Sequence, residues 1–190
     1  AEGAVTEDAT QQTTATGTLT ASDIDGDSLT FSVVSSTGTY GSLAIDGTSG
    51  VWTYTLNNSD TDTDSLSEGE SVTDTIKVTV SDGQGGSTIK DVEVTITGSN
   101  DVPVITSAST AAEGAVTEDA TQQTTATGTL TASDVDDDSL TFSVAGTNGI
   151  YGTLAIDAAN AGAWTYILNN SDTDTDSLSQ GESVTDTITV

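Results

Sequence analysis

One long stretch of this chain occurs twice. Residues 1–33 recur as residues 112–144 with two differences, where Val135 and Asp137 replace an isoleucine and a glycine of the first copy. The copies stay in register until one extra residue enters within residues 158–163, after which a tryptophan in each copy aligns again. Tandem duplication of this kind is typical of arrays in which each unit contacts mainly its neighbours. The repeat therefore predicts two copies of one folding unit.

Within each copy, apolar side chains alternate with polar ones. The pattern is clear in residues 29–33 and 92–96, where Leu, Phe, Val or Ile occupies every second position. A period of two with many β-branched residues predicts strands that bury one face, and clusters of Gly, Asn, Asp and Ser between the runs predict turns. We count about seven strands per copy, as in an immunoglobulin-type sandwich, and find no helical period. The expected fold class is all-β, with two tandem β-sandwiches.

A joint between the copies lies at residues 98–104, which contain the only proline of the chain. We therefore predict two modules, residues 1–101 and 102–190. Residues 102–107 would form the first strand of the second module, and the first module has no counterpart of that strand. The second copy reaches Val190 and so lacks the counterpart of the last strand of the first copy. We expect these gaps to be the limits of a piece of a longer chain; the alternative is that a neighbouring chain supplies the missing strand to an open sheet edge.

The charge and the residue types restrict what the chain can do. There are 30 acidic residues against two lysines, Lys77 and Lys90, and the formal net charge is −28 at pH 7. Such a chain is not expected to bind nucleic acid or an anionic membrane surface, and no apolar run is long enough for membrane insertion. Because the sequence has no His and no Cys, Ser-His and Cys-His catalysis and His or Cys zinc sites are excluded. We expect no enzyme activity.

The acidic residues gather in clusters, at residues 7–8, 23–27 and 57–64 and in the joint. Ca²⁺ takes roughly six to eight oxygen ligands in a flexible shell, so carboxylates at short spacing in turns favour a calcium site. The EF-hand pattern does not fit, because the twelfth residue from Asp23 is Val34 instead of glutamate. For any one cluster, a calcium site and plain turn chemistry both remain open. Because the sequence has no cysteine for disulfides, we expect calcium to stabilise the fold if this is an extracellular β protein.

Four motifs resemble a known family. ASDIDGD at residues 21–27, LTFSV at 29–33, GVWTY at 50–54 and GSNDVPV at 98–104 resemble the VCBS repeat, a bacterial cadherin-like module that is strung in long arrays in giant secreted adhesins. The resemblance covers essentially the whole chain. It implies two tandem immunoglobulin/cadherin-like β-sandwiches that are secreted or held at the bacterial cell surface.

The Asp-x-Asp and Asn-Asp-x-Pro motifs are also similar to those of cadherins, which bind calcium between successive domains. Carried over to this sequence, the similarity implies a Ca²⁺ site at the joint. The implied ligands are Glu7, Asp82, Asn100, Asp101, Asp134 and Asp136. By the same similarity, Asp23 and Asp25 would serve a joint with a preceding module.

These features predict a structural extender of a bacterial adhesin. Calcium would offset the repulsion between clustered carboxylates and stiffen the joint, so that the array projects a distal binding domain. The expected partners are neighbouring repeats of the same chain, with other copies of the chain as a further option. Two alternatives stay open. One is a subunit of a surface filament that assembles by strand exchange, and the other is a carbohydrate-binding module with Tyr40 and Tyr151 as candidate platforms.

Overall fold

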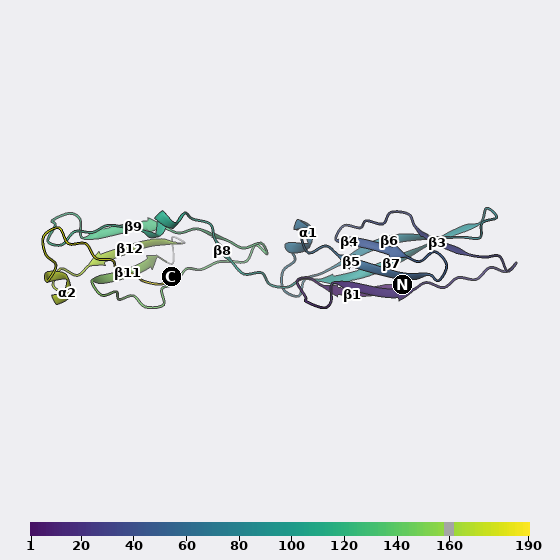
Figure 1. The fold of residues 1–190 in the computed structure, drawn as a ribbon, viewed down its shortest axis with the longest axis horizontal. Helices are drawn as coiled ribbons and strands as arrows, with labels where there is room; N and C mark the ends of the chain where they lie inside the picture. Colours follow the sequence, from purple (N-terminus) through teal and green to yellow (C-terminus); the bar gives the residue numbers. More distant parts are fainter. Residues whose placement is uncertain (158–161) are drawn as a thin grey trace. The chain divides into compact units, whose positions relative to one another are not determined.

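The computed structural model describes residues 1–157 and 162–190 and is all-β apart from short helical turns (Figure 1). The predicted fold class is thereby confirmed. The extra residue of the second copy, expected within residues 158–163, falls partly outside the described residues.

Contacts within the chain divide it into two compact units. Unit 1 comprises Ala1–Val102 together with the loop Val135–Asp138, and unit 2 comprises Pro103–Asp134 and Ser139–Val190. The short loop that contains Asp136 therefore belongs to unit 1, although the residues on both sides of it belong to unit 2.

Unit 1, all of whose residues are described, is built from two sheets. One has four strands in the order β1-β7-β6-β3, and the other has three in the order β2-β5-β4 (Figure 1). Strand β1 runs parallel to β7, whereas the other pairings are antiparallel. The elements are β1 (Glu2–Thr6), β2 (Thr14–Thr18), β3 (Thr30–Val33), β4 (Gly41–Ile45), β5 (Val51–Leu56), α1 (Thr61–Asp64), β6 (Ser71–Ser81) and β7 (Ser87–Thr97).

The two sheets of unit 1 share one apolar core. Strand β7 shows why, because Val92, Val94 and Ile96 are buried while Glu93 between them is exposed. These side chains belong to the same buried cluster as Trp52 on β5, in the other sheet. The alternation of the sequence thus becomes a strand with one buried face, as expected from the pleat of a β-strand.

Strand β2 approaches the ring of Trp52 closely at Gly17. A Cβ atom at this position would lie 2.5 Å from Trp52 Cζ2, well inside van der Waals contact. Replacing Gly17 by alanine is therefore expected to lower the free energy of unfolding of unit 1 by about 1–3 kcal/mol, because overpacking forces neighbouring side chains out of their preferred rotamers. Urea unfolding followed by tryptophan fluorescence measures the loss.

The matched control is Thr16→Ala, because Thr16 lies on the exposed face of the same strand. This control tests strand propensity alone and should change the free energy of unfolding by no more than about 1 kcal/mol. Equal losses for the two variants would contradict the close approach at Gly17.

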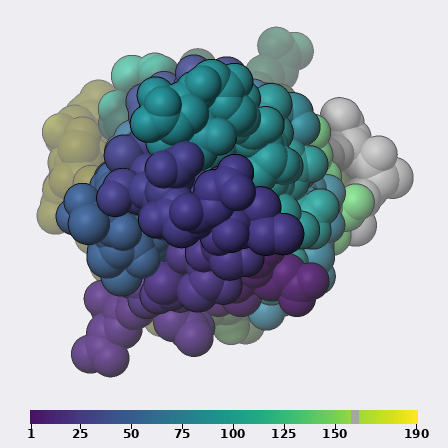
Figure 2. Space-filling model, turned by 90° about the vertical axis from the view of Figure 1, so that its right-hand side faces the viewer, coloured from purple at the N-terminus to yellow at the C-terminus, as the bar shows by residue number. Residues whose placement is uncertain are grey.

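Strands β6 and β7 form a long hairpin of 11 residues on each side. Asp82 closes its turn, because its Oδ1 accepts hydrogen bonds from the backbone N–H groups of Gln84 at 2.7 Å and Gly86 at 2.9 Å. Figure 2 views the end of unit 1 that carries this turn (teal), beside the loop of residues 20–28 (dark purple).

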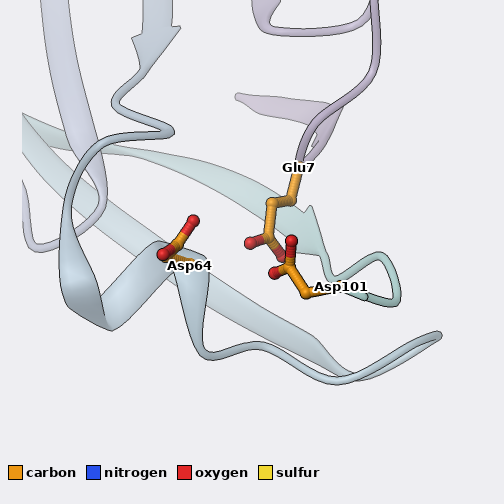
Figure 3. A group of neighbouring side chains, drawn as sticks. All are labelled: Glu7, Asp64 and Asp101. Carbon is orange, nitrogen blue, oxygen red and sulfur yellow. The ribbon is translucent and has the colours of Figure 1, made fainter. Parts of the chain in front are cut away.

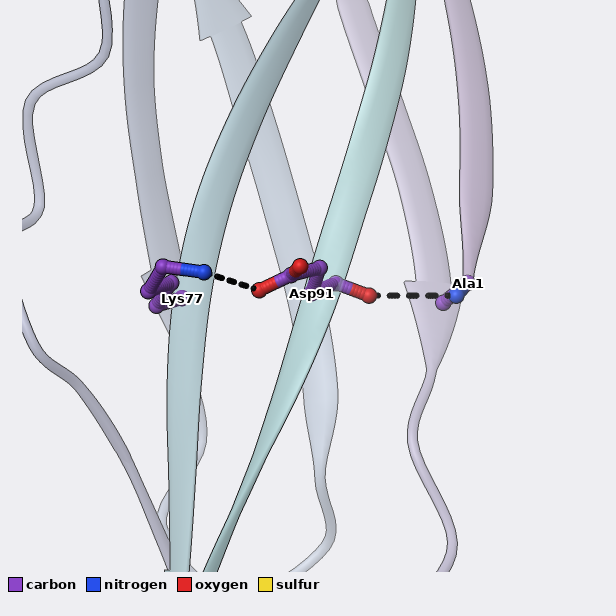
Figure 4. A network of polar contacts seen from close by, with 3 residues as sticks. All are labelled: Ala1, Lys77 and Asp91. Carbon is purple, nitrogen blue, oxygen red and sulfur yellow. Dashed lines mark hydrogen bonds and ion pairs between the residues drawn. The ribbon is translucent and has the colours of Figure 1, made fainter.

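The hairpin also carries an ion pair on its exposed face. Lys77 Nζ lies 2.9 Å from Asp91 Oδ1, and the amino group of Ala1 donates to the carbonyl oxygen of Asp91 at 3.4 Å (Figure 4). Because both charged side chains are well exposed, water and salt screen the pair and its contribution to stability is small.

A buried carboxylate attaches the chain before β4 to strand β6. Asp74 is 4 % exposed. It accepts hydrogen bonds from the Tyr54 hydroxyl at 2.8 Å and from the backbone N–H groups of Thr39 and Tyr40 at 3.2 Å each. Burial, together with the Asp74 carboxylate, raises the pKa of Tyr54 above its ordinary value. The tyrosine hydroxyl therefore keeps its proton and remains a donor.

Unit 2 repeats part of this arrangement. A three-stranded sheet has the order β11-β12-β9, and β8 pairs antiparallel with β10. Strand β8 lies within the predicted first strand of the second module, residues 102–107. Among the described residues of unit 2, the segments 113–117 and 183–190 form no strand, although they correspond in sequence to β1 and to the first part of β6. The elements are β8 (Val104–Ile105), η1 (Ser109–Ala112), β9 (Thr125–Thr129), β10 (Ala132–Ser133), β11 (Gly152–Asp157), β12 (Ala163–Leu168) and α2 (Thr173–Asp176).

Candidate cation site

Glu7 is a fully buried carboxylate at the end of β1, with an exposed fraction of 1 %. Its backbone N–H donates to Thr97 O at 3.0 Å, which extends the β1–β7 pairing, and Asp8 then turns the chain with a left-handed φ of 49°. Glu7 Oε2 accepts a hydrogen bond from Ser99 N at 3.3 Å. Glu7 Oε1 is buried and finds no hydrogen-bond partner among the described residues. Such an oxygen is costly to bury unless a proton or a cation meets it.

Helix α1 brings Asp64 to the same place. The helix is a single turn, begun by Asp60, whose side chain accepts a hydrogen bond from Asp62 N at 3.1 Å. Thr63 is fully buried and its hydroxyl donates to Tyr40 O at 3.5 Å. Because this contact anchors the helical turn, the position of the half-buried Asp64 carboxylate, one residue further on, is defined.

The joint after β7 packs against the loop that follows α1. Gly98 N donates to Glu70 O at 2.8 Å, and Gly98 O accepts from Gly69 N at 3.2 Å. A Cβ atom at Gly98 would clash with the backbone of Leu66, so this approach requires glycine. The contact directs the next residues of the joint, including Asp101, toward the end of β1.

Asp136 also belongs to this end of unit 1. Its side chain is 7 % exposed. Asp136 Oδ2 accepts a hydrogen bond from Asp101 N at 2.8 Å, and its carbonyl oxygen accepts one from Ser67 Oγ at 3.4 Å. The loop Val135–Asp138 is therefore tied to the joint and to the segment after α1 by hydrogen bonds.

Three carboxylates from separate elements converge here (Figure 3). Oxygens of Glu7, Asp64 and Asp101 all lie within 4.8 Å of one another. The pKa of Glu7 is raised to about 7, chiefly by burial, with the carboxylates of Asp8, Asp101 and Asp136 adding to the rise and a backbone hydrogen bond opposing it. The group thus combines desolvation with like-charge repulsion, the two effects that most disfavour an ionised carboxylate.

This donor set fits a calcium ion. Ca²⁺ prefers carboxylate, carbonyl and water oxygens in a loose shell, and it supplies the positive charge that clustered carboxylates need. The chain has little positive charge of its own to offer, since its two lysines lie on the β6–β7 hairpin. The unpartnered Glu7 Oε1 is the feature that an ion would satisfy most directly.

The structure brings together several of the predicted ligands. Glu7 and Asp101 belong to the group, and Asp136 is hydrogen-bonded to Asp101. Asn100 lies next to the group in sequence, but its side-chain amide donates to Asp101 O and its backbone N–H donates to Glu68 Oε2 at 3.1 Å. That these residues bind a metal remains a prediction.

Asp134, another predicted ligand, belongs to a second carboxylate group within residues 134–138. Oxygens of Asp134, Asp136 and Asp138 lie within 4.8 Å of one another. In the first copy, the equivalent Asp23 Oδ1 accepts hydrogen bonds from Asp25 N at 2.8 Å and Asp27 N at 3.3 Å, as in an ordinary aspartate-closed turn.

Asp82 is separated from the group, which corrects the expectation that it joins Glu7. It follows β6, at the turn that closes the β6–β7 hairpin, whereas Glu7 lies at the opposite end of β7. Eleven residues of strand at about 3.3 Å each place these two ends roughly 35 Å apart. The Asp82 carboxylate accepts hydrogen bonds from backbone N–H groups of its own turn.

Asp64 is the member of the group that the sequence analysis did not assign as a ligand. The acidic run of residues 57–64 was identified, but no helix was expected there. An aspartate that precedes further acidic residues, as Asp60 does, is an N-cap signal with acids in the first turn. That signal predicts a helical turn. A helical turn here would have indicated that Asp64, at its end, differs in position from the exposed acidic residues before it.

The fold and this site together define an acidic β-sandwich module with a candidate cation site at one end. Residues 1–98 match the family described as bacterial cadherin-like domain, and the chain belongs to this family. Cadherin-like domains are non-catalytic adhesion modules. No helix among the described residues is long and apolar enough to cross a membrane.

Solved structures of cadherins are similar to the chain. Drosophila N-cadherin EC1-4 has 16 % identity and a TM-score of 0.45, with 93 % of this chain and 40 % of that chain covered. Mouse cadherin-23 EC22-24 has 19 % identity and a TM-score of 0.42, with 88 % and 50 % covered. Protocadherin gamma B7 domains 1-4 has 16 % identity and a TM-score of 0.44, with 88 % and 39 % covered. The chain therefore spans half or less of these structures. No curated protein matches it.

Proposed function

We propose that this chain is a calcium-stiffened extender, two tandem repeats of the VCBS type (residues 1–101 and 102–190) from a secreted or cell-surface bacterial adhesin. Its partners are then the neighbouring repeats of the same chain. The observation that carries the proposal is the buried Glu7 carboxylate, which has an unpartnered oxygen and lies beside Asp64 and Asp101. Membership of the bacterial cadherin-like family supports an adhesion-related role.

The mechanism is electrostatic. Without a cation, the carboxylates of Glu7, Asp64 and Asp101 repel one another, and the joint that holds Asp101 is held less firmly. An ion shared by them offsets the repulsion and ties the joint to β1 and α1. Because Asp136 is hydrogen-bonded to Asp101 and its loop continues into unit 2 at both ends, the same ion restrains the chain that connects the two units.

The carbohydrate-binding alternative needs exposed aromatic platforms. Tyr40 is partly buried and packs against the core of unit 1, and Tyr151 is half-buried. Partly buried rings are weaker candidates for stacking on a sugar than fully exposed ones, so the extender role has the stronger support.

Calcium is expected to bind the chain and to stabilise unit 1. At a free calcium concentration of about 100 times Kd, the gain in free energy of unfolding is about 2.7 kcal/mol. Asp64→Asn and Asp101→Asn should each weaken binding by about tenfold or more, because the number of charged ligands sets the affinity of such sites. Isothermal titration calorimetry measures the affinity, and thermal unfolding with and without a chelator measures the stabilisation.

The control is Asp82→Asn, which removes the same charge at the opposite end of the hairpin and should leave calcium affinity unchanged. Equal weakening by Asp82→Asn and Asp101→Asn, or no binding at all, would reject the site. Stiffening is tested separately by small-angle scattering. If calcium binds but chelation leaves the dimensions of the chain unchanged, the site stands and the extender mechanism fails.

A further inference from the structure

Unit 2 contains the one asparagine of the chain that is followed by glycine, Asn148. Every other asparagine precedes a residue that has a side chain. Glycine has no Cβ, so its backbone nitrogen can approach the preceding side chain with the least steric hindrance. The three Asp-Gly pairs of the sequence are poorer targets for the same attack, because an ionised carboxylate repels a nucleophile. Asn148 is therefore the side chain most open to reaction with its own backbone.

Asn148 lies in the tight turn that leads into β11. It forms an isolated antiparallel bridge with Thr153, and Gly149 N donates to Gly152 O at 2.8 Å. The residue is exposed, so water reaches its amide. The hydroxyl of Thr147 donates to Asn148 Oδ1 at 3.5 Å. A donor at this oxygen stabilises the negative charge that develops there when the amide carbon is attacked.

The fold requires glycine at position 149 for a reason unrelated to this chemistry. A Cβ atom on Gly149 would clash with the carboxylate of Asp186. That carboxylate holds the turn, because it accepts hydrogen bonds from the backbone N–H groups of Ile150 and Tyr151 at 3.0 and 3.1 Å. With the glycine fixed in this way, the residue before it decides whether the turn is reactive.

Unit 1 contains the same turn with an inert residue in place of the asparagine. Gly38 N donates to Gly41 O at 2.8 Å, and a Cβ atom on Gly38 would clash with Asp74. Thr37 occupies the position of Asn148 and is also exposed. Because β6 and β7 are both in place in unit 1, the shape and exposure of the turn do not depend on how far the second copy extends.

We propose that Asn148 is a site of spontaneous deamidation, a covalent modification of unit 2 that the equivalent turn of unit 1 does not undergo. Gly149 N attacks Asn148 Cγ, the new N–Cγ bond closes a cyclic imide, and the side-chain nitrogen leaves as ammonia with the proton of Gly149 N. Water then opens the imide. Cleavage of the N–Cγ bond leaves an ordinary aspartyl residue, whereas cleavage at the α-carbonyl carbon leaves an isoaspartyl linkage. Water is the only co-reactant, and nothing is oxidised or reduced.

The reaction alters the turn itself. Ring closure removes the proton that Gly149 N donates to Gly152 O, so the turn must open locally before the attack. Both products carry a new carboxylate next in sequence to the glycine that packs against Asp186. The isoaspartyl product also adds a methylene to the backbone, which disrupts the bridge between Asn148 and Thr153. Deamidation should therefore loosen this turn of unit 2 and leave unit 1 unchanged. This inference does not depend on the calcium site.

Incubation of the full chain at neutral pH, followed by mass spectrometry of peptic fragments, tests the inference. The fragment that contains Asn148 should gain the mass that replaces an amide NH2 by OH, and chromatography should resolve aspartyl and isoaspartyl forms. A free peptide of residues 145–153 should react roughly tenfold or more faster, because no turn has to open first. Asn148→Thr, which introduces the residue of unit 1, should abolish the mass gain in this fragment.

The matched variant that should create the reaction is Thr37→Asn. It places an asparagine before Gly38 in unit 1, which should then deamidate at the equivalent turn. An inert Thr37→Asn variant would mean that the turn does not carry the reactivity, and it would overturn the proposal. Two further results would do the same: an unchanged Asn148 fragment after the free peptide has reacted completely, or equally fast reaction at another asparagine such as Asn58.

Discussion

Replacing Glu7 by glutamine should stabilise unit 1 in the absence of calcium at neutral pH and remove most of the stabilisation that calcium provides. In the chelated protein, ionised Glu7 is buried with an unpartnered oxygen beside Asp101 and Asp64. Glutamine keeps the size of the side chain and removes the charge, so the penalty disappears. With calcium present, the charge is what binds the ion, so its removal lowers the affinity.

The pH dependence gives the sign and the size of this effect. The pKa of Glu7 rises from an ordinary 4.5 to about 7 in the folded chain, so the fold prefers the protonated form. Its contribution to stability is fully present below pH 4.5 and is lost as the pH rises to about 7, a loss of about 3 kcal/mol. Calcium should reverse the loss at neutral pH, because it stabilises the ionised form.

The measurement is urea unfolding from pH 4.5 to 8, in chelator and in calcium. A Trp164→Phe background leaves Trp52 as the only tryptophan, so fluorescence reports unit 1 alone. The matched control is Glu118→Gln, which changes the equivalent residue of the second copy and should leave unit 1 unaffected. If Glu7→Gln is less stable than the parent in chelator, or keeps the full calcium response, then Glu7 does not carry the site.

The strands were predictable because burial along a strand is a local property. In residues 92–96, each side chain points to one face or the other according to its place in the pleat, and the sequence displays that period directly. The segment 183–190 has the same alternation as β6 and yet forms no strand. A strand also needs a paired neighbour, and pairing is not a local property of the segment.

Which acidic residues come together at the site depends on the order and direction of the strands. The clustering of charge along the sequence does not show that order. Asp82 precedes β7 and Asp101 follows it, so a single strand separates the two loops and places them at opposite ends of the sheet. This separation follows from any assignment of residues 87–97 as one strand. The contact of Glu7 with the joint, in contrast, depends on the parallel pairing of β1 with β7, which are about 90 residues apart in sequence. No local sequence pattern predicts that pairing.

Removing the Asp74 carboxylate is expected to have the largest effect on stability, a loss of about 3–5 kcal/mol from unit 1 for Asp74→Ala. The carboxylate accepts three hydrogen bonds in a buried place, from the Tyr54 hydroxyl and the backbone N–H groups of Thr39 and Tyr40. Its removal leaves these donors unsatisfied, and each buried unsatisfied group costs about 1–3 kcal/mol. Water that enters the space left by the side chain can accept some of these hydrogen bonds, which reduces the total loss of stability.

Two matched variants separate this network from simple loss of a side chain. Tyr54→Phe removes one donor and leaves the carboxylate with two, so it should cost only about 1–1.5 kcal/mol. Asp186→Ala removes the equivalent carboxylate of unit 2, which is less deeply buried, and should cost unit 2 less than Asp74→Ala costs unit 1. Urea unfolding in single-tryptophan backgrounds follows each unit. A loss below about 1 kcal/mol for Asp74→Ala would mean that water replaces the carboxylate at all three donors, and the chain before β4 would then be held to β6 by apolar packing instead of by this carboxylate.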